Sequence, residues 1–534
     1  MKKHGFAILF FTVFTCSLFA QNHLDILTSI QGAHHESCFG ETMTTIDYNH
    51  DGYDDLVVCS PAWRNPYPSP VDIKGRVDVY FGGTNLDIVP DVSFLGTYEG
   101  QYDIVLNVGD VNGDGFEDLY IGGAESIANP PVHYIRIYTG GEGSPTEPGI
   151  LIPYNFHVDD WSHCYVVRMG DINGDHLSEI GFILGVPINA DAFYIVYGGS
   201  FEPILITIAN IHSTSYTWGF NGIGDVNNDG YDDFSIGYTY DDPNVGYHLI
   251  TLYYGNEGGL LTDTQVLIQT QAPISKQSNP IGDFNGDGID DFVGYESNEG
   301  LNVWLGSSSL NTNPDLFLNP PWQGDYSGFS LKFGDINHDG YDDIVGTNIY
   351  TDQFRVWMGK WQVSGTSDLL VNAPYVPSNL LDYFGYALTM GDYNGDGCCD
   401  IAVSAPFTDN SMAHDYRGYV YVYAGNTDFV SNDDPYTPAL GKLTLFPNPL
   451  HPQKAELNVR FTTPLDPPSG RGVRPSIFEI YNIRGQKVKS YILTVEQAKA
   501  GAASFNLYDL PTGVYICKVH DGNHFLQHKL TIIK

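Results

Sequence analysis

Seven short segments of the chain carry aspartate and asparagine at one repeated spacing. Each follows the nine-residue pattern D-x-N-x-D-G-x-x-D, which places carboxylate or amide oxygens at positions 1, 3, 5 and 9. Ca²⁺ takes about six to eight hard oxygen ligands in a flexible geometry, which is what such a segment offers. Glycine at position 6 permits the positive φ that wraps the chain around an ion. The pattern therefore predicts one calcium site in each segment, up to seven in all.

We number the repeats 1 to 7 in chain order and call each nine-residue segment an acidic loop. The predicted metal ligands are Asp47, Asn49, Asp51, Asp55 in repeat 1, Asp110, Asn112, Asp114, Asp118 in repeat 2, Asp171, Asn173, Asp175, Glu179 in repeat 3, Asp225, Asn227, Asp229, Asp233 in repeat 4, Asp283, Asn285, Asp287, Asp291 in repeat 5, Asp335, Asn337, Asp339, Asp343 in repeat 6, and Asp392, Asn394, Asp396, Asp400 in repeat 7.

The acidic loops admit two other interpretations. An EF-hand begins in the same way but needs an acidic residue at position 12. That position holds only Val, Ile, Phe or Gly here, so the EF-hand and its flanking helices are rejected. Asp-Gly segments also form ordinary turns. Seven loops with their oxygens in register favour cation sites over plain turns.

The loop of repeat 3 departs from the pattern. His176 replaces the glycine and Glu179 replaces the final aspartate. A left-handed backbone is strained at any residue with a Cβ atom. We expect this loop to bind calcium most weakly or to stay empty.

The spacing of the loops predicts the fold. Their first residues lie 63, 61, 54, 58, 52 and 57 residues apart, and each loop stands between two short apolar strands. A third strand of alternating aromatic and aliphatic residues ends in glycine, and a more variable fourth strand follows. Four strands per repeat of this length are typical of a propeller blade. We predict an all-β chain whose residues 21–428 form a seven-bladed β-propeller, with residues 24–30 supplying the outer strand of the last blade.

Composition limits the compartment and the partners. Residues 1–20 have the basic start and short apolar run of a signal peptide, and no later segment is apolar enough to cross a membrane. Residues 21–441 hold 58 acidic and 10 basic side chains, a net charge of −48. A region this acidic repels nucleic acid and anionic lipid. We expect an exported protein without a transmembrane segment.

A second unit follows a linker at residues 429–441. Residues 442–534 hold 12 basic and 6 acidic side chains, and about seven alternating strands can be assigned between residues 443 and 533. Seven short strands in some ninety residues suggest a small β-sandwich of immunoglobulin-like type.

Two stretches of the sequence resemble known families. The FG-GAP/VCBS-type repeat of integrin α-subunits and bacterial relatives is resembled by two segments of the first region. They are residues 384–406, FGYALTMGDYNGDGCCDIAVSAP, and residues 38–62, CFGETMTTIDYNHDGYDDLVVCSPA. Residues 442–534 resemble the type A sorting domain of the type IX secretion system. The motifs that carry this resemblance are LFPNP, EIYNIRGQKV, LPTGVYICKV and the final KLTIIK. The resemblance implies export across the outer membrane of a Gram-negative bacterium, with release or attachment at the cell surface, through contact with the secretion machinery.

No catalytic site can be assigned from the sequence. The acidic pairs fall almost entirely within the acidic loops, and neither GxSxG nor HExxH occurs. We expect a binding or adhesion module for a glycan or a surface protein, and the alternative is a polysaccharide-degrading lyase or glycosidase on a propeller scaffold. Aromatic rings that could stack on sugars, or could equally pack between blades, are Trp63, Tyr67, Trp161, Trp218, Trp322 and Trp361.

Overall fold

The computed structural model describes residues between 24 and 532 of the 534-residue chain, which divides into two compact units, 1–433 and 434–534. The segments between these bounds that lie outside the description are 35–36, 63–73, 85, 97–101, 124–132, 142, 144, 155–163, 185–191, 207–215, 243–244, 260–264, 271–273, 297–299, 319–329, 361–364, 366, 375–382, 409–415, 428, 430–442, 447–455, 462–476, 483–486, 495–496, 498–501, 508–509 and 521–524. The predicted signal peptide and nearly all of the predicted linker fall outside it.

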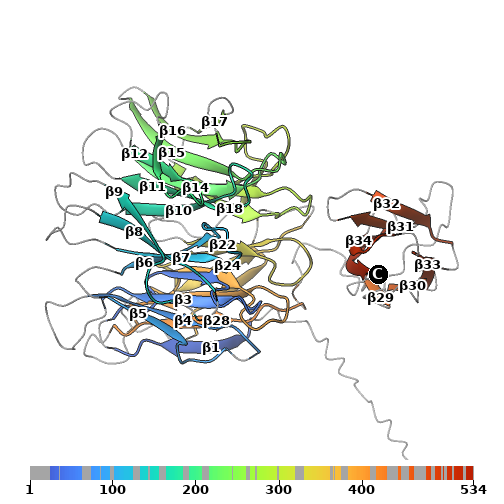
Figure 1. Ribbon diagram of the computed structural model, residues 1–534, viewed down its shortest axis with the longest axis horizontal. Helices are drawn as coiled ribbons and strands as arrows, with labels where there is room; N and C mark the ends of the chain where they lie inside the picture. Colours follow the sequence, from blue (N-terminus) through green and yellow to red (C-terminus); the bar gives the residue numbers. More distant parts are fainter. Residues whose placement is uncertain are drawn as a thin grey trace, which may run out of the picture. The chain divides into compact units, whose positions relative to one another are not determined.

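The first unit is all-β and consists of four-stranded antiparallel sheets, seven in number, each built on one repeat (Figure 1). The first three sheets contain β2 (Met43–Ile46), β3 (Asp55–Ser60), β4 (Arg76–Tyr80) and β5 (Val92–Leu95), then β6 (Ile104–Gly109), β7 (Asp118–Gly122), β8 (His133–Tyr138) and β9 (Ile150–Tyr154), then β10 (Cys164–Gly170), β11 (Glu179–Leu184), β12 (Ala192–Val196) and β13 (Pro203–Ile206).

The next three sheets follow the same order of strands. They contain β14 (Tyr216–Gly224), β15 (Asp233–Asp242), β16 (Val245–Tyr253) and β17 (Gln265–Thr270), then β18 (Ile274–Gly282), β19 (Asp291–Glu296), β20 (Gly300–Trp304) and β21 (Leu316–Leu318), then β22 (Leu331–Gly334), β23 (Asp343–Asn348), β24 (Gln353–Trp357) and β25 (Leu369–Asn372).

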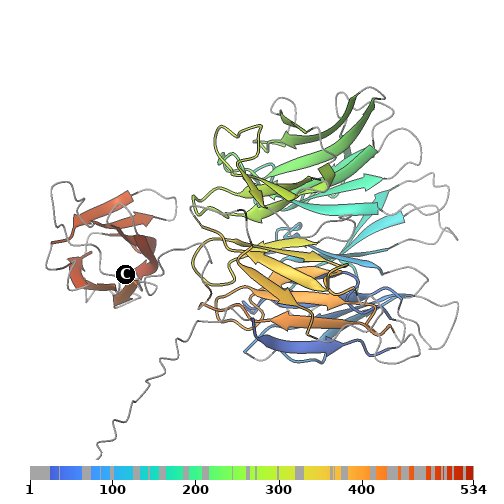
Figure 2. The same cartoon turned by 180° about the vertical axis from the view of Figure 1, so that it is seen from behind.

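The sheet of repeat 7 takes its outer strand from the start of the chain. It contains β26 (Leu388–Gly391), β27 (Asp400–Ala405) and β28 (Tyr419–Tyr423), and β1 (Ile26–Gln31) pairs antiparallel with β28. Figure 2 shows blue β1 beside the orange strands of this sheet. The predicted pairing is confirmed. It covers the edge of β28, which would otherwise be open to association.

The first strands of the sheets contact one another in a closed order. β2 contacts β6, and the series continues through β10, β14, β18, β22 and β26, which contacts β2 again. Successive side chains of a strand point to opposite sides of its sheet. In the second strands, the side chains on both sides are buried. In β3, Val57 packs into the apolar cluster shared with repeat 2, whereas Leu56 and Val58 pack against Ala402 and Val420 of repeat 7.

The second unit has two sheets. β29 (Leu443–Phe446), β30 (Glu456–Phe461) and β33 (Ala502–Asn506) form one, and β32 (Lys487–Ile492), β31 (Ile477–Asn482), β34 (Gly513–His520) and β35 (Phe525–Ile532) form the other. Both sheets contribute to one apolar core, which includes Leu457, Phe478 and Phe505. The sequence predicts about seven strands here, and the described residues form seven, β29 to β35. Among the residues described, no helix has the length and hydropathy to span a bilayer.

Candidate metal centres

Each acidic loop joins the first strand of its sheet to the second. Position 9 is the first residue of the second strand and is fully buried in all seven repeats. In repeat 1, Asp55 Oδ2 accepts the amide of Tyr48 (2.9 Å) and Asp55 Oδ1 accepts that of Gly82 (2.8 Å), at the end of the third strand. The carboxylate therefore holds the loop against its own sheet.

The same contacts recur in the other repeats. A position-9 oxygen accepts the third-strand glycine amide at 2.7–3.2 Å in all seven. The loop of repeat 7 differs at the other oxygen. The Tyr393 amide donates to the Gly391 carbonyl (3.1 Å), and among the described residues the buried Asp400 Oδ2 accepts no hydrogen bond of standard geometry.

Positions 1, 3 and 5 are oriented by the backbone of their own loop. The position-1 carboxylate accepts the position-6 amide at 2.8–3.1 Å in every repeat. The asparagine at position 3 accepts the position-5 amide at 2.8–3.0 Å, and the position-5 carboxylate accepts the position-7 amide at 2.9–3.1 Å. The side chains thus fold the loop around their oxygens.

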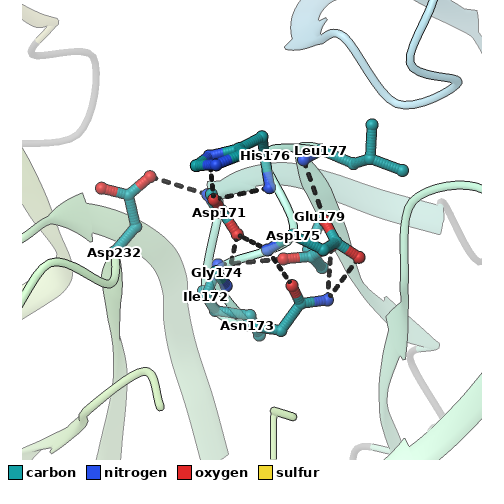
Figure 3. A network of polar contacts seen from close by, with 9 residues as sticks. All are labelled: Asp171, Ile172, Asn173, Gly174, Asp175, His176, Leu177, Glu179 and Asp232. Atoms are coloured by element: carbon teal, nitrogen blue, oxygen red, sulfur yellow. Dashed lines mark hydrogen bonds and ion pairs between the residues drawn. The ribbon is translucent and has the colours of Figure 1, made fainter. Parts of the chain in front are cut away.

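Position 3 also connects the carboxylates. In repeat 3, Asn173 Nδ2 donates to Asp175 Oδ2 (3.1 Å) and to Glu179 Oε1 (3.3 Å) (Figure 3). The amide nitrogen occupies the space between two like charges and reduces their repulsion. Positions 3, 5 and 9 of this repeat are therefore linked by hydrogen bonds from the asparagine side chain.

The electrostatics of position 9 are unfavourable to a charged carboxylate. Burial raises the pKa of Asp55 to about 7, although backbone amides oppose the shift, and the charges of Asp51 and Asp47 raise it further. For the same reasons the pKa of Asp233 and that of Asp291 rise to about 8. A bound cation would supply the missing positive charge.

The loop of repeat 3 keeps the hydrogen bonds of the others despite its changed residues. His176 adopts φ 70°, in the left-handed region that glycine occupies in the other six loops at φ 87–94°. Its amide still donates to Asp171 Oδ2 (2.9 Å), and its exposed ring places Nδ1 3.7 Å from the same carboxylate oxygen. The predicted backbone strain is present, while the arrangement of oxygens is retained.

The donor set fits a hard cation. Every loop offers carboxylate and amide oxygens, and an oxygen that accepts one amide keeps a second lone pair. The loop of repeat 7 also contains Cys398 and Cys399, but burial raises the pKa of both thiols, which disfavours the thiolate form that binds metals. Within the described residues, no group of three or more His, Cys, Asp or Glu side chains converges as a finished metal site. Side chains of positions 1 and 5, now turned to backbone amides, would have to rotate slightly toward an ion.

The structure does not test the predicted sugar-stacking residues Trp63, Tyr67, Trp161, Trp218, Trp322 and Trp361 as a group. Trp218 belongs to β14, and the other five lie outside the described residues. The sequence did not single out the third-strand glycines whose amides hold position 9. The signal for them was the glycine that ends each third strand, for example Gly82 and Gly425.

Comparison with family models gives two matches. The model described as FG-GAP repeat matches residues 39–80 and 384–423, and the one described as secretion system C-terminal sorting domain matches residues 444–534. These are the two resemblances expected from the sequence motifs.

Curated relatives are integrin α-subunits. The chain is 33% identical to integrin alpha-PS2 of Drosophila melanogaster over 27% of its length, 34% to integrin alpha pat-2 of Caenorhabditis elegans over 29%, and 32% to integrin alpha-V of Gallus gallus over 27%. The matched parts span 11%, 14% and 15% of those relatives.

A solved structure of PorZ, a surface component of the type IX secretion system of Porphyromonas gingivalis, is similar over 92% of this chain and 59% of that one, with 12% identity and a TM-score of 0.35. A score this low carries no argument about the fold. The sequence matches are what identify the chain: it carries FG-GAP repeats like those of integrin α-subunits and a C-terminal sorting domain of the type IX secretion system, and is secreted or attached to the outer cell surface.

Proposed function

We propose that the first unit is a calcium-stabilised seven-bladed β-propeller that serves as a binding or adhesion module at the cell surface. The observation that carries this proposal is the repetition of one four-stranded sheet and one acidic loop seven times, with first strands in contact in a closed order. The match to FG-GAP repeats supports it. The second unit would be an immunoglobulin-like sandwich that engages the secretion machinery.

Calcium is assigned a structural role. Extracellular modules bind Ca²⁺ with Kd of about 10⁻⁴–10⁻³ M. At millimolar calcium, a site at the tight end of this range adds about 1.4 kcal/mol, so seven sites add about 10 kcal/mol. This is comparable with the whole net stability of a domain. The ions would offset the repulsion among the carboxylates of each loop.

The partner is proposed to be a glycan or a surface protein. The similarity to integrin α-subunits and the sorting of the chain to the surface support binding over an intracellular role. With a net charge of −48 on residues 21–441, the module would bind neutral or cationic surfaces and not nucleic acid.

The experiment is an array of glycans and surface proteins probed with the calcium-loaded chain, with analysis of any released product. The chain is expected to bind one or more members of the array, to lose this binding in EDTA, and to regain it when calcium is added. Release of depolymerised glycan would show that the chain is an enzyme and not a binding module. Absence of both retention and product across the array would contradict a binding function.

A further inference from the structure

Position 8 of the acidic loop, which is not among the proposed ligands, reaches into the neighbouring repeat. Four repeats carry an aspartate there, and its Oδ2 atom accepts the amide of position 1 in the preceding repeat. We call Asp54, Asp232, Asp290 and Asp342 the bridging aspartates. The distances are 2.7 Å from Asp392, 2.7 Å from Asp171, 3.0 Å from Asp225 and 2.9 Å from Asp283, respectively. Figure 3 shows the Asp232 side chain, just before β15, directed toward the amide of Asp171.

Backbone bonds run beside these side-chain bonds. The amide of Asp232 donates back to the Asp171 carbonyl at 3.0 Å, and the amide of Asp342 donates to the Asp283 carbonyl at 3.1 Å. In all seven repeats, the residue after the third-strand glycine donates its amide to the position-2 carbonyl of the preceding repeat, as Asn256 does to Ile172 (3.0 Å). The acidic loops are therefore connected in a continuous series, which the bond from Asp392 to Asp54 closes.

The residue before each acidic loop fits this contact. It is glycine in six repeats, and a Cβ atom at Gly170, Gly224 or Gly282 would lie under 3.0 Å from a bridging carboxylate. In repeat 1 the residue is Ile46, and position 8 of the following repeat is Glu117. Glu117 binds Asn107 Nδ2 (2.9 Å) and Arg168 Nη1 (3.2 Å) instead.

Two further boundaries have no bridging carboxylate. Position 8 is Ser178 in repeat 3 and Cys399 in repeat 7, and there the position-8 residue contributes a backbone bond, at 2.8 Å from the Ser178 amide to the Asp110 carbonyl and 2.8 Å from the Cys399 amide to the Asp335 carbonyl. Four boundaries between repeats are thus bridged by an aspartate and three are not.

We propose that the bridging aspartates are positioning residues that couple cation binding in one acidic loop to the packing of the next repeat. The inference rests on the proposed calcium sites. Position 1 supplies a ligand from its side chain while its amide is held by the neighbour's carboxylate. Fixing this amide orders the ligand before the ion arrives, and binding of the ion strengthens the contact in return, since coupling between two sites is reciprocal. The cation also offsets the repulsion between the two carboxylates.

The test uses the full chain with Asp290→Ala, which removes the acceptor for the Asp225 amide. Asp290→Asn keeps an oxygen acceptor and is the conservative variant. Ser178→Ala, at an unbridged boundary, is the matched control. Hydrogen exchange of peptides covering residues 222–230 is followed in the metal-free protein, and calcium titrations follow affinity.

Asp290→Ala is expected to speed exchange at residues 222–230 by about fivefold to tenfold, as loss of one partly buried hydrogen bond implies. It should also weaken calcium binding at one site by a similar factor, without changing the number of ions bound. Asp290→Asn should bring the exchange rate and the calcium affinity most of the way back to the wild-type values. Ser178→Ala should change neither quantity. If hydrogen exchange at residues 222–230 is unchanged in Asp290→Ala, the bond from the Asp225 amide to Asp290 does not order this loop, and the proposal fails at its first step. Faster exchange with unchanged calcium affinity would overturn the coupling, whereas absence of calcium binding in every variant would refute the proposed sites instead.

Discussion

The two units of the chain are stabilised in different ways. The second has one continuous apolar core shared by its two sheets, in a segment with 12 basic and 6 acidic side chains. The apolar residues of the first are divided among separate clusters, such as the two that flank β3, in a region of net charge −48. The second unit thus has one core that both of its sheets share, whereas in the first unit each sheet packs its apolar side chains against the neighbouring repeats, beside loops rich in like charges. If the proposed calcium sites exist, the first unit should depend on cations and the second should not.

Calcium removal should separate the two units most strongly. In excess EDTA the first unit is expected to lose on the order of 10 kcal/mol of stability, because seven loops would lose their ions. The second unit has no acidic loop and should unfold at the same temperature with and without calcium. Differential scanning calorimetry measures both transitions. If calcium removal lowers the unfolding temperatures of both units equally, the proposed difference between the units is wrong.

A core substitution should show the opposite selectivity. Phe478 is fully buried, with its ring stacked 4.4 Å from that of Phe505 between centroids. Phe478→Ala is expected to lower the stability of the second unit by about 3–5 kcal/mol, in calcium and in EDTA alike. Ile492→Ala, at a side chain 71% exposed, is the control and should change stability by less than about 0.5 kcal/mol. Urea unfolding of the second unit gives both values.

The pH dependence should also distinguish the units. The position-9 carboxylates have pKa values raised by burial, to about 7 for Asp118 and about 8 for Glu179. A raised pKa in the folded state favours folding at low pH, and this contribution is lost as the pH rises through the folded value. In EDTA the melting temperature of the first unit should therefore fall between pH 5 and pH 8. Calcium should abolish that fall, and a metal-free first unit that becomes more stable over this range would refute the argument.

The smallest effect is expected at the loop of repeat 3. His176 holds φ 70° where glycine is unstrained. His176→Gly should raise the stability of the first unit by about 1 kcal/mol, the cost of a left-handed residue. The gain should be larger in calcium than in EDTA, because relief of strain would also tighten the ion site. A loss of stability would show that the ring of His176, near Asp171, contributes more than the strain costs.

Local patterns predicted much of the structure. Alternation placed the strands of the second unit, and the unpaired residues 24–30 predicted the pairing of β1 with β28. The bridge from Asp232 to Asp171 was not predicted, because it joins two residues 61 positions apart and depends on how their repeats face each other. The burial of Asp55 was missed for a related reason: its spacing indicates a ligand, and only the folded sheet shows the Gly82 amide opposite it.

The number of calcium ions bound per chain tests the central claim most directly. Equilibrium dialysis of the intact chain against millimolar calcium, followed by metal analysis, is expected to give seven ions, or six if the loop of repeat 3 stays empty. The matched control replaces position 1 of a single loop, Asp283→Asn, and should remove one ion. A chain that binds no calcium, or whose count is unchanged by that substitution, would contradict the account.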